Sequence, residues 1–197
     1  MIYVVVVFGR TGMGISSLVN LIIGKTEANV SNDCQQCTQK VGRYDAGIDD
    51  TKLEVCDIPG FDVSKKSIDN TVASIVQIHK KRGIDLLINC LQPTHGIAPR
   101  YYQAVASAVG PEVPIAAVVT HLEREDGAME NWWSRNGGTL ESQKELKFVD
   151  HACVTTGGLC ATDHGHDTDT LRRQESERAV RALISRHCKE PKRPPSS

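Results

Sequence analysis

The most constraining feature of this sequence is a glycine-rich stretch that joins two apolar segments near its start. The stretch reads Gly9-Arg10-Thr11-Gly12-Met13-Gly14-Ile15-Ser16-Ser17 and follows an apolar, β-branched run at 2–7. Apolar residues then recur at helical spacing from residue 18, which predicts a buried strand, a turn and a helix. In that context, backbone N–H groups and a helix N-terminus hold phosphate, in the pattern G-x-x-x-x-G-K-[ST]. Gly9, Gly14 and Ser16 match the pattern, but Ile15 stands where it has lysine.

The isoleucine at position 15 removes the strongest electrostatic contact of such a phosphate-binding loop. The usual lysine places a positive charge on the terminal phosphates and on the charge that develops during phosphoryl transfer. Isoleucine has neither charge nor donor, so we expect weaker binding of a triphosphate. Arg10 is the candidate replacement, because other proteins with such loops place a second lysine at this position, where it can act across a dimer interface.

The rest of the chain alternates predicted strands with predicted helices, which indicates an α/β sheet covered on both faces. We expect strands at 2–8, 41–46, 52–56, 84–90, 114–119 and 152–155, and helices at 15–24, 66–81, 100–109 and 170–187. The last helix is expected to turn Leu171, Val180, Leu183 and Ile184 inward, and Trp132-Trp133 to anchor a further helix on the domain. One domain over 1–188 is expected, with a disordered basic and proline-rich tail at 189–197.

A second motif, Asp57-Ile58-Pro59-Gly60, comes directly after a predicted strand. We expect Asp57 to hold Mg²⁺ together with Ser16, and the Gly60 N–H to meet a terminal phosphate. Thr38, in the preceding loop, is expected to close on the metal. The loop at 9–17, Asp57, 89–92 and 120–123 all fall at carboxyl ends of predicted strands, where α/β sheets bind ligands.

Composition excludes several other classes of function. The chain has 197 residues and a net charge of −1, which gives no electrostatic reason to expect a nucleic-acid or anionic-membrane partner. No apolar run approaches the roughly 20 residues of a membrane span, and no leader precedes the first strand, so a cytoplasmic protein is expected. Cys56 and Cys90 are expected to be small core residues. Cys34-x-x-Cys37 would need a second ligand pair for zinc, with His164 and His166 as candidates, and unpaired thiols are the favoured interpretation.

These motifs resemble those of Ras-like P-loop GTPase domains, nearest to the septin and immunity-associated branches. Within these, the chain looks like single-domain G-domain proteins common in mushroom-forming fungi. The stretches that carry the resemblance are 8–20, 37–38, 57–60, 85–90, 120–123, 131–136 and 151–155. The resemblance implies a three-layer G domain with a mostly parallel six-stranded sheet and one antiparallel edge strand.

The resemblance also assigns roles to individual residues. Gly12, Gly14, Ser16 and Ser17 would hold phosphates, and Ser16, Thr38 and Asp57 would form the Mg²⁺ shell. Thr120-His121-Leu122-Glu123 takes the place of the guanine-specifying motif [NT]-K-x-D. Glu123 would accept from N1 and the 2-amino group of guanine, His121 would stack on the base, and Thr155 falls at the last base-contact motif. Phe61 replaces the glutamine that orients water in many GTPases, which together with Ile15 implies little turnover.

Three functional hypotheses remain open at this point. The first is a degenerate GTP-binding protein that holds GTP or GDP with Mg²⁺, hydrolyses slowly or not at all, and works as a switch or scaffold, with a homodimer across the nucleotide face as one arrangement. The second is a G-domain fold whose cleft hosts other chemistry, with acid–base steps by Asp57, His95, His121 and Glu123. The third is an interaction module without a ligand that uses the Trp132-Trp133 face.

Overall fold

The computed structural model describes residues 1–25, 28, 40–62, 64–93, 99–144, 146–156 and 166–189, without the side chains of 143, 144 and 166–169. Thr38, His95, the Cys34–Cys37 pair, His164 and the tail from residue 190 lie outside the described residues, as does the side chain of His166. The expectations that concern them therefore stay predictions.

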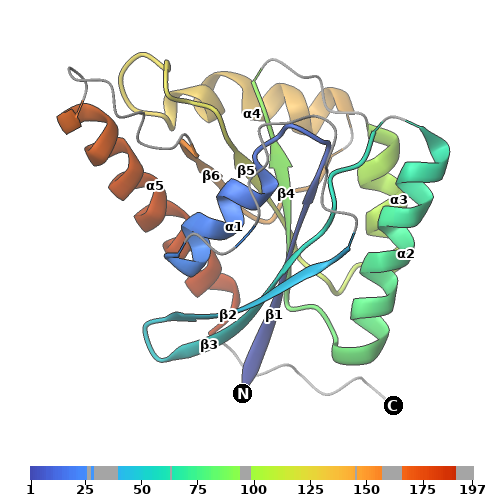
Figure 1. Cartoon of the computed structure of the whole chain (residues 1–197). Coiled ribbons are helices and arrows are strands. Elements are labelled where there is room, and N and C mark those ends of the chain that lie inside the picture. The colour runs from blue at the N-terminus through green and yellow to red at the C-terminus, as the bar shows by residue number, and fades with distance from the viewer. Residues whose placement is uncertain are drawn as a thin grey trace.

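Six strands form one sheet, and its order confirms the predicted mostly parallel architecture (Figure 1). The strands are β1 (Ile2–Gly9), β2 (Gly42–Ile48), β3 (Thr51–Asp57), β4 (Leu86–Leu91), β5 (Ile115–Val119) and β6 (His151–Cys153). Their spatial order is β2-β3-β1-β4-β5-β6, and β2 at one edge is the strand that runs antiparallel to its neighbour. The first strand of the chain therefore lies inside the sheet, between β3 and β4.

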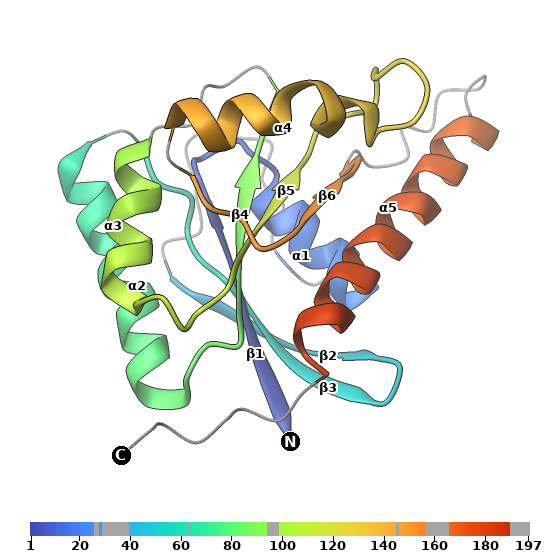
Figure 2. The ribbon, with the colours of Figure 1, turned by 180° about the vertical axis from the view of Figure 1, so that it is seen from behind.

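Helices cover both faces of the sheet, as Figures 1 and 2 show from opposite sides. The helices are α1 (Ile15–Ile23), α2 (Lys65–Arg82), α3 (Pro99–Val109), α4 (Asn131–Lys144) and α5 (His166–His187). Tyr3, Val5 and Val7 of β1 join the cluster under α1 and α5, whereas Val4, Val6 and Phe8 join the cluster under α2 and α3. Because successive side chains of a strand point to opposite faces, the continuous apolar run of β1 supplies both cores.

Local sequence signals explain where several helices begin and end. Gly24 ends α1 in a left-handed conformation and donates from its N–H to the Asn20 carbonyl at 3.0 Å. Ser64 caps α2 by accepting a hydrogen bond from the Ser67 N–H, and basic residues fill the last turn of that helix. No described helix is both long and apolar enough to cross a membrane.

The prediction for the last helix is wrong at one residue. Leu171 is 56% exposed, whereas Val180, Leu183 and Ile184 are buried as predicted. The inward stripe of α5 passes instead through Ser176, which is fully buried. The beginning of this helix packs against polar backbone rather than against the apolar core, so helical spacing among apolar residues misidentified its inner face.

The predicted anchoring role of the tryptophan pair is confirmed. Trp132 and Trp133 on α4 are partly buried against the α2/α3-side core. The Trp133 ring stacks on the His151 ring of β6, with centroids 4.2 Å apart and planes 8° apart. Cys56, Cys90, Cys153 and Cys188 are buried and form no disulfide within the described part of the chain, and the first two are small core residues as expected.

Candidate nucleotide site

The loop between β1 and α1, residues 9–16 and called the P-loop below, is flanked by the loops that follow β5 and β6. Gly14 has a φ of 74°, a left-handed value that favours glycine. A Cβ atom at Gly14 would lie 2.9 Å from Thr156 Oγ1 and 3.1 Å from His121 Cε1. The structure therefore brings the predicted site residues Gly14 and His121 together, and it adds Thr156, which sequence analysis missed.

The two predicted magnesium ligands of the described chain contact each other directly. The Ser16 hydroxyl donates to Asp57 Oδ2 at 2.9 Å, although 41 residues separate them in sequence. Asp57 is 2% exposed, and this burial raises the pKa of its carboxyl group, while the Ser16 hydrogen bond opposes the rise. A hydroxyl and a poorly solvated carboxylate form a set of hard oxygen ligands that fits Mg²⁺.

Ile15, at the lysine position, points into the protein. Its side chain is 6% exposed and belongs to the apolar cluster that also contains Met13 and Leu18. The residue therefore supports the packing of α1 and does not form the wall of an open cleft. The P-loop keeps its backbone shape and its hydroxyl groups, but position 15 supplies no cation to a phosphate.

The second motif is joined to the P-loop by a short parallel β-bridge between Arg10 and Phe61. The Thr11 N–H donates to the Phe61 carbonyl at 2.9 Å, and the Phe61 N–H donates to the Gly9 carbonyl at 3.3 Å. A Cβ at Gly60 would lie only 2.8 Å from Thr11 Cα, so glycine is required for this close approach. Gly60 thus lies against the P-loop, and the contact of its N–H with a terminal phosphate stays a prediction.

The Phe61 side chain of this bridge packs against α3. Phe61 is 2% exposed, and its ring centroid lies 4.5 Å from that of Tyr101. Burial raises the pKa of the Tyr101 hydroxyl, and its hydrogen bond to Asn89 and the charge of Arg10 oppose this rise. Arg10 is half-buried, and its side chain makes no hydrogen bond or ion pair with another residue in the described part of the chain.

Beneath the P-loop, buried polar groups tie it to β4 and to the end of β5. Thr120 is fully buried, and its Oγ1 lies 2.8 Å from the Met13 carbonyl and 3.0 Å from the Leu91 carbonyl. The Cys90 thiol also donates to the Met13 carbonyl, and burial raises the pKa of this thiol to about 12. Cys90 is therefore a neutral donor that holds the loop from below.

At the other end of the site, the predicted base-reading residue Glu123 meets the predicted Thr155. Glu123 is exposed, and its Oε1 accepts a hydrogen bond from the Thr155 hydroxyl at 2.7 Å. His121 has a φ of 60°, and its Nδ1 lies 2.9 Å from Thr120 Oγ1. A carboxylate that a hydroxyl orients at the edge of a cleft has the acceptor chemistry needed to read guanine N–H groups.

Two residues of α5 hold these base-side loops, and sequence analysis did not identify either of them. The Arg172 guanidinium donates to the backbone carbonyls of Leu122, Glu123, Glu125 and Gly127. The Ser176 hydroxyl accepts from the Thr155 N–H at 2.9 Å. No local pattern marks such contacts, because Arg172 lies 45 to 50 residues after the carbonyls that it binds.

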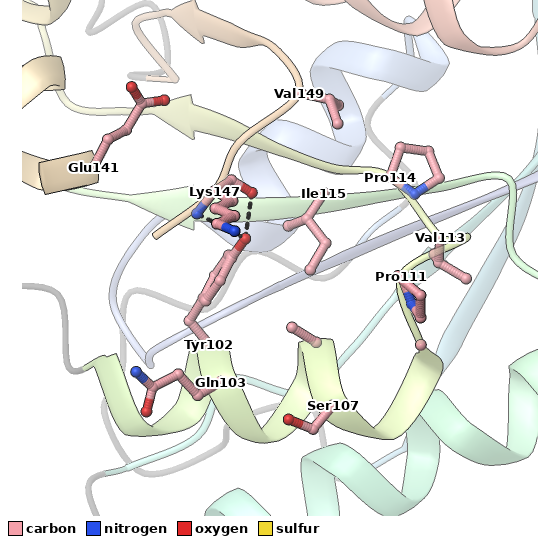
Figure 3. A pocket seen from close by; sticks show the side chains of 12 residues that line it. Tyr102, Gln103, Ser107, Pro111, Val113, Pro114, Ile115, Glu141, Lys147 and Val149 are labelled. Atoms are coloured by element: carbon pink, nitrogen blue, oxygen red, sulfur yellow. Dashed lines mark hydrogen bonds between the residues drawn. The ribbon is translucent and has the colours of Figure 1, made fainter. Parts of the chain in front are cut away.

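A pocket of about 860 Å³ lies beside α3 and the beginning of β5. Figure 3 shows the side chains that line it. Tyr102 and Ala106 of α3, Pro114 and Ile115 before and in β5, and Val149 before β6 contribute to its lining. The Tyr102 hydroxyl bonds to the backbone of 147 inside it. Because Ile115 begins β5, whereas Thr120 follows its other end, this pocket and the P-loop lie at opposite ends of that strand.

The structure adds little to the acid–base hypothesis. Asp57, His121 and Glu123 each contact a hydroxyl group, from Ser16, Thr120 and Thr155 respectively. Within the described part of the chain, no group of three or more His, Cys, Asp or Glu side chains gathers as a metal site.

The sequence matches a protein-family model over much of its length. The family described as 50S ribosome-binding GTPase matches residues 4–121, which is more than half of the chain and includes the P-loop, Asp57, Gly60 and Thr120. No curated protein sequence matches the chain closely enough to be a relative.

Solved structures with similar folds include several GTPases. Toc33 from Arabidopsis thaliana, solved with GDP and Mg²⁺, has a TM-score of 0.65 and 14% identity, covering 95% of this chain and 86% of its own. Era with MgGDPNP and a 16S ribosomal RNA segment has a TM-score of 0.64 and 16% identity, covering 98% of this chain and 59% of its own. Aquifex aeolicus Era bound to GDP and AlF4⁻ has a TM-score of 0.60 and 18% identity, with 97% and 58% covered.

At these identities the similarity establishes the fold, and the family match establishes the class. The sheet order, the P-loop between β1 and α1, and Asp57 at the end of β3 are all consistent with that match. The chain therefore belongs to the P-loop GTPase family described as 50S ribosome-binding GTPase, and its fold is that of a G domain.

Proposed function

We propose that this protein binds a guanine nucleotide together with Mg²⁺, hydrolyses GTP slowly or not at all, and acts as a switch or scaffold. The observation that carries the proposal is that paired side chains flank the P-loop at both ends. Ser16 and Asp57 are in contact at the phosphate end, and Glu123 and Thr155 are in contact at the base end. A fold that no longer held a nucleotide would have no need for both pairs.

At the phosphate end, the available groups fit Mg²⁺ and the backbone of a phosphate cradle. Ser16 and Asp57 would hold the metal, with Thr38 as a further ligand, and the bound metal would neutralise phosphate charge. The residues from Gly12 to Ser17 would supply backbone N–H groups at the N-terminus of α1. Ile15 is the exception, because a buried isoleucine provides no charge.

At the base end, Glu123 would accept hydrogen bonds from the N1 and 2-amino groups of guanine. Its carboxylate is exposed and oriented by the Thr155 hydroxyl. The exposed ring of His121 lies beside Gly14 and would stack on the base. These side chains favour guanine over adenine, because adenine has no N–H donor at N1.

Slow hydrolysis follows from two positions. The Phe61 side chain is buried against Tyr101, so the residue after the second motif presents no polar group to a water molecule. Ile15 adds no charge that would stabilise phosphoryl transfer. Arg10 is the remaining cation of the P-loop, and because its half-buried side chain has no hydrogen bond or ion pair with another described residue, it is available for a contact across an interface.

A homodimer across the nucleotide face is the arrangement we propose for such a contact. For the chloroplast translocon components Toc33 and Toc159, dimerization is important for GTPase activity. We expect nucleotide-dependent dimers of the present chain in analytical ultracentrifugation and their loss in Arg10→Ala. An unchanged dimer in Arg10→Ala would remove the proposed role of that residue.

The proposal has two further parts. The chain is placed in the septin and immunity-associated branch of these GTPases, and the protein is placed in the cytoplasm.

The proposal is tested by titrating fluorescent GDP and GTP, with and without Mg²⁺, against the wild type and Ile15→Lys. Ile15→Met serves as the control, because it changes the residue at position 15 but keeps an uncharged, apolar side chain of similar volume. Micromolar or tighter, Mg²⁺-dependent binding by the wild type is expected. Binding that appears only in Ile15→Lys would show that the wild-type site has lost its ligand, and binding by neither protein would overturn the proposal.

A further inference from the structure

We infer that Arg172 and Ser176 of α5 are positioning residues for recognition of the nucleotide base, which they support by fixing Glu123 and Thr155 from behind. The inference rests on the proposed function. The inference gives the C-terminal helix a role in base recognition, although no P-loop, metal-binding or base-reading motif lies in that helix. The evidence is the set of hydrogen bonds that Arg172 and Ser176 make.

Arg172 binds the loop after β5 through four backbone carbonyls. Its Nη1 lies 2.9 Å from the Leu122 carbonyl and 3.1 Å from the Glu123 carbonyl, and its Nη2 lies 2.7 Å from the Glu125 carbonyl and 3.2 Å from the Gly127 carbonyl. The planar guanidinium presents its donors in a fixed fork, so one side chain defines the path of the whole segment. Without Arg172, the carbonyls of Glu125 and Gly127 would have to accept hydrogen bonds from water.

Ser176, one helical turn further along α5, holds the loop after β6. Its hydroxyl accepts from the Thr155 N–H at 2.9 Å and donates to the Arg172 carbonyl at 2.7 Å. Ser176 is fully buried and Thr155 is 5% exposed, so this contact is shielded from water. Residues i and i+4 share a helix face, and one face of α5 therefore reaches both base-side loops.

The consequence is that Glu123 is fixed at both ends. Arg172 holds its backbone carbonyl, and Thr155, itself held by Ser176, donates to its carboxylate. Glutamate has one more rotatable bond than the aspartate usual at this motif, so its carboxylate has more freedom to lose when it binds a base. Fixing both ends in advance lowers that cost, as preorganisation does in other binding sites.

The experiment compares the affinities of the wild type and of Arg172→Met for GDP and for IDP, whose base lacks the 2-amino group that Glu123 would bind. Methionine keeps a long apolar stem and removes every donor. Arg173→Met is the matched control, since Arg173 is the next residue on α5 and makes none of these contacts. The expected result is a fall of about tenfold in the GDP-to-IDP affinity ratio of Arg172→Met only. Arg172→Lys, with charge but no fork, should lose about threefold.

A second readout needs no nucleotide. Amide hydrogen exchange of residues 122–127 in the free protein should become at least tenfold faster in Arg172→Met, while exchange in β1 and β4 stays at the wild-type rate. Uniformly faster exchange would show general destabilisation and would overturn a specific positioning role, as would an unchanged GDP-to-IDP ratio in a variant that still binds GDP. Failure of the wild type to bind GDP at all would instead overturn the proposed function, whatever the exchange rates.

Discussion

The phosphate end and the base end of the site are built differently. At the phosphate end, the contacts are made by the P-loop and second motif themselves, through the Ser16–Asp57 hydrogen bond and the bridge between Arg10 and Phe61. At the base end, the motif side chains are supported by a separate helix, through Arg172 and Ser176. The phosphate end has a buried isoleucine at the lysine position, whereas the base end has a carboxylate that the Thr155 hydroxyl orients.

The two ends differ in whether the shape of the site depends on its charged groups. The P-loop backbone is held by Thr120 and Cys90 whether or not position 15 carries a cation, because both groups donate to the Met13 carbonyl. The shape of a phosphate cradle therefore survives the loss of its charge. At the base end, shape cannot be separated from charge in this way. The Thr155 hydroxyl both positions the Glu123 side chain and donates a hydrogen bond to its carboxylate.

The largest effect is expected from Ile15→Lys, which restores charge where shape remains. Nucleotide affinity should rise about 100-fold, the order expected of a charge-assisted hydrogen bond in a poorly solvated site. The same change removes a buried apolar side chain from the cluster under α1, so the free energy of unfolding should fall by about 2 kcal/mol. Isothermal calorimetry and urea denaturation measure the two effects, and unchanged affinity would contradict the account of the phosphate end.

Asp57→Asn should lower Mg²⁺-dependent affinity by roughly 30-fold, because an amide binds Mg²⁺ less strongly than a carboxylate does. The free protein should become more stable at neutral pH. Burial raises the pKa of Asp57, so the neutral form favours the fold at low pH and this contribution is lost as the pH rises through the raised pKa. Thermal unfolding across acid and neutral pH tests this, and a variant less stable than the wild type at neutral pH would refute it.

Thr155→Val tests the base end and should weaken GDP binding by about tenfold, since it removes the hydroxyl that orients Glu123. Binding of IDP should change less, because one of the carboxylate's partners is already missing from that base. Thr51→Val, at the beginning of β3, is a control with the same chemical change far from the site. Equal losses for GDP and IDP would indicate a general disturbance rather than lost base recognition.

Phe61→Gln is expected to have almost no effect on the rate of GTP hydrolysis. Although glutamine is the usual water-orienting residue, the side chain at position 61 faces Tyr101, so the hydrolysis rate should stay within about twofold of wild type. Stability should fall by about 3 kcal/mol, as for other large losses from an apolar core. Single-turnover assays measure the rate, with Phe61→Leu as the apolar control. A tenfold rise would show that position 61 reaches the nucleotide.

Short-range patterns in the sequence predicted most of the fold. Each strand was found within a few residues of its bounds, because buried parallel strands read as apolar runs and glycine marks the turns. The residues of the two phosphate motifs were identified for the same reason. The burial of Ile15 could not be predicted, since its direction depends on how α1 packs against β1.

The supporting contacts of the base end were invisible to the same reasoning. Arg172 looks like one more charged residue in an amphipathic helix, and its neighbour Leu171 looks like the inward one. Only the fold brings the beginning of α5 against the loop after β5, where backbone carbonyls attract arginine and give leucine nothing to pack against. Spacing within one helix cannot reveal a partner some 50 residues away.

The inner position of β1 has a consequence for how the chain folds. This strand precedes both of its partners in the chain, because it pairs with β3 and with β4, whose last residue is Leu91. Until those segments have been synthesised, the uncharged, β-rich run Ile2–Gly9 has neither neighbour, and such runs are prone to aggregate. Parallel pairing between distant segments is also slow, because the intervening loops must close first. Folding during synthesis should therefore depend on protection of the segment Ile2–Gly9 more than on any residue of the site.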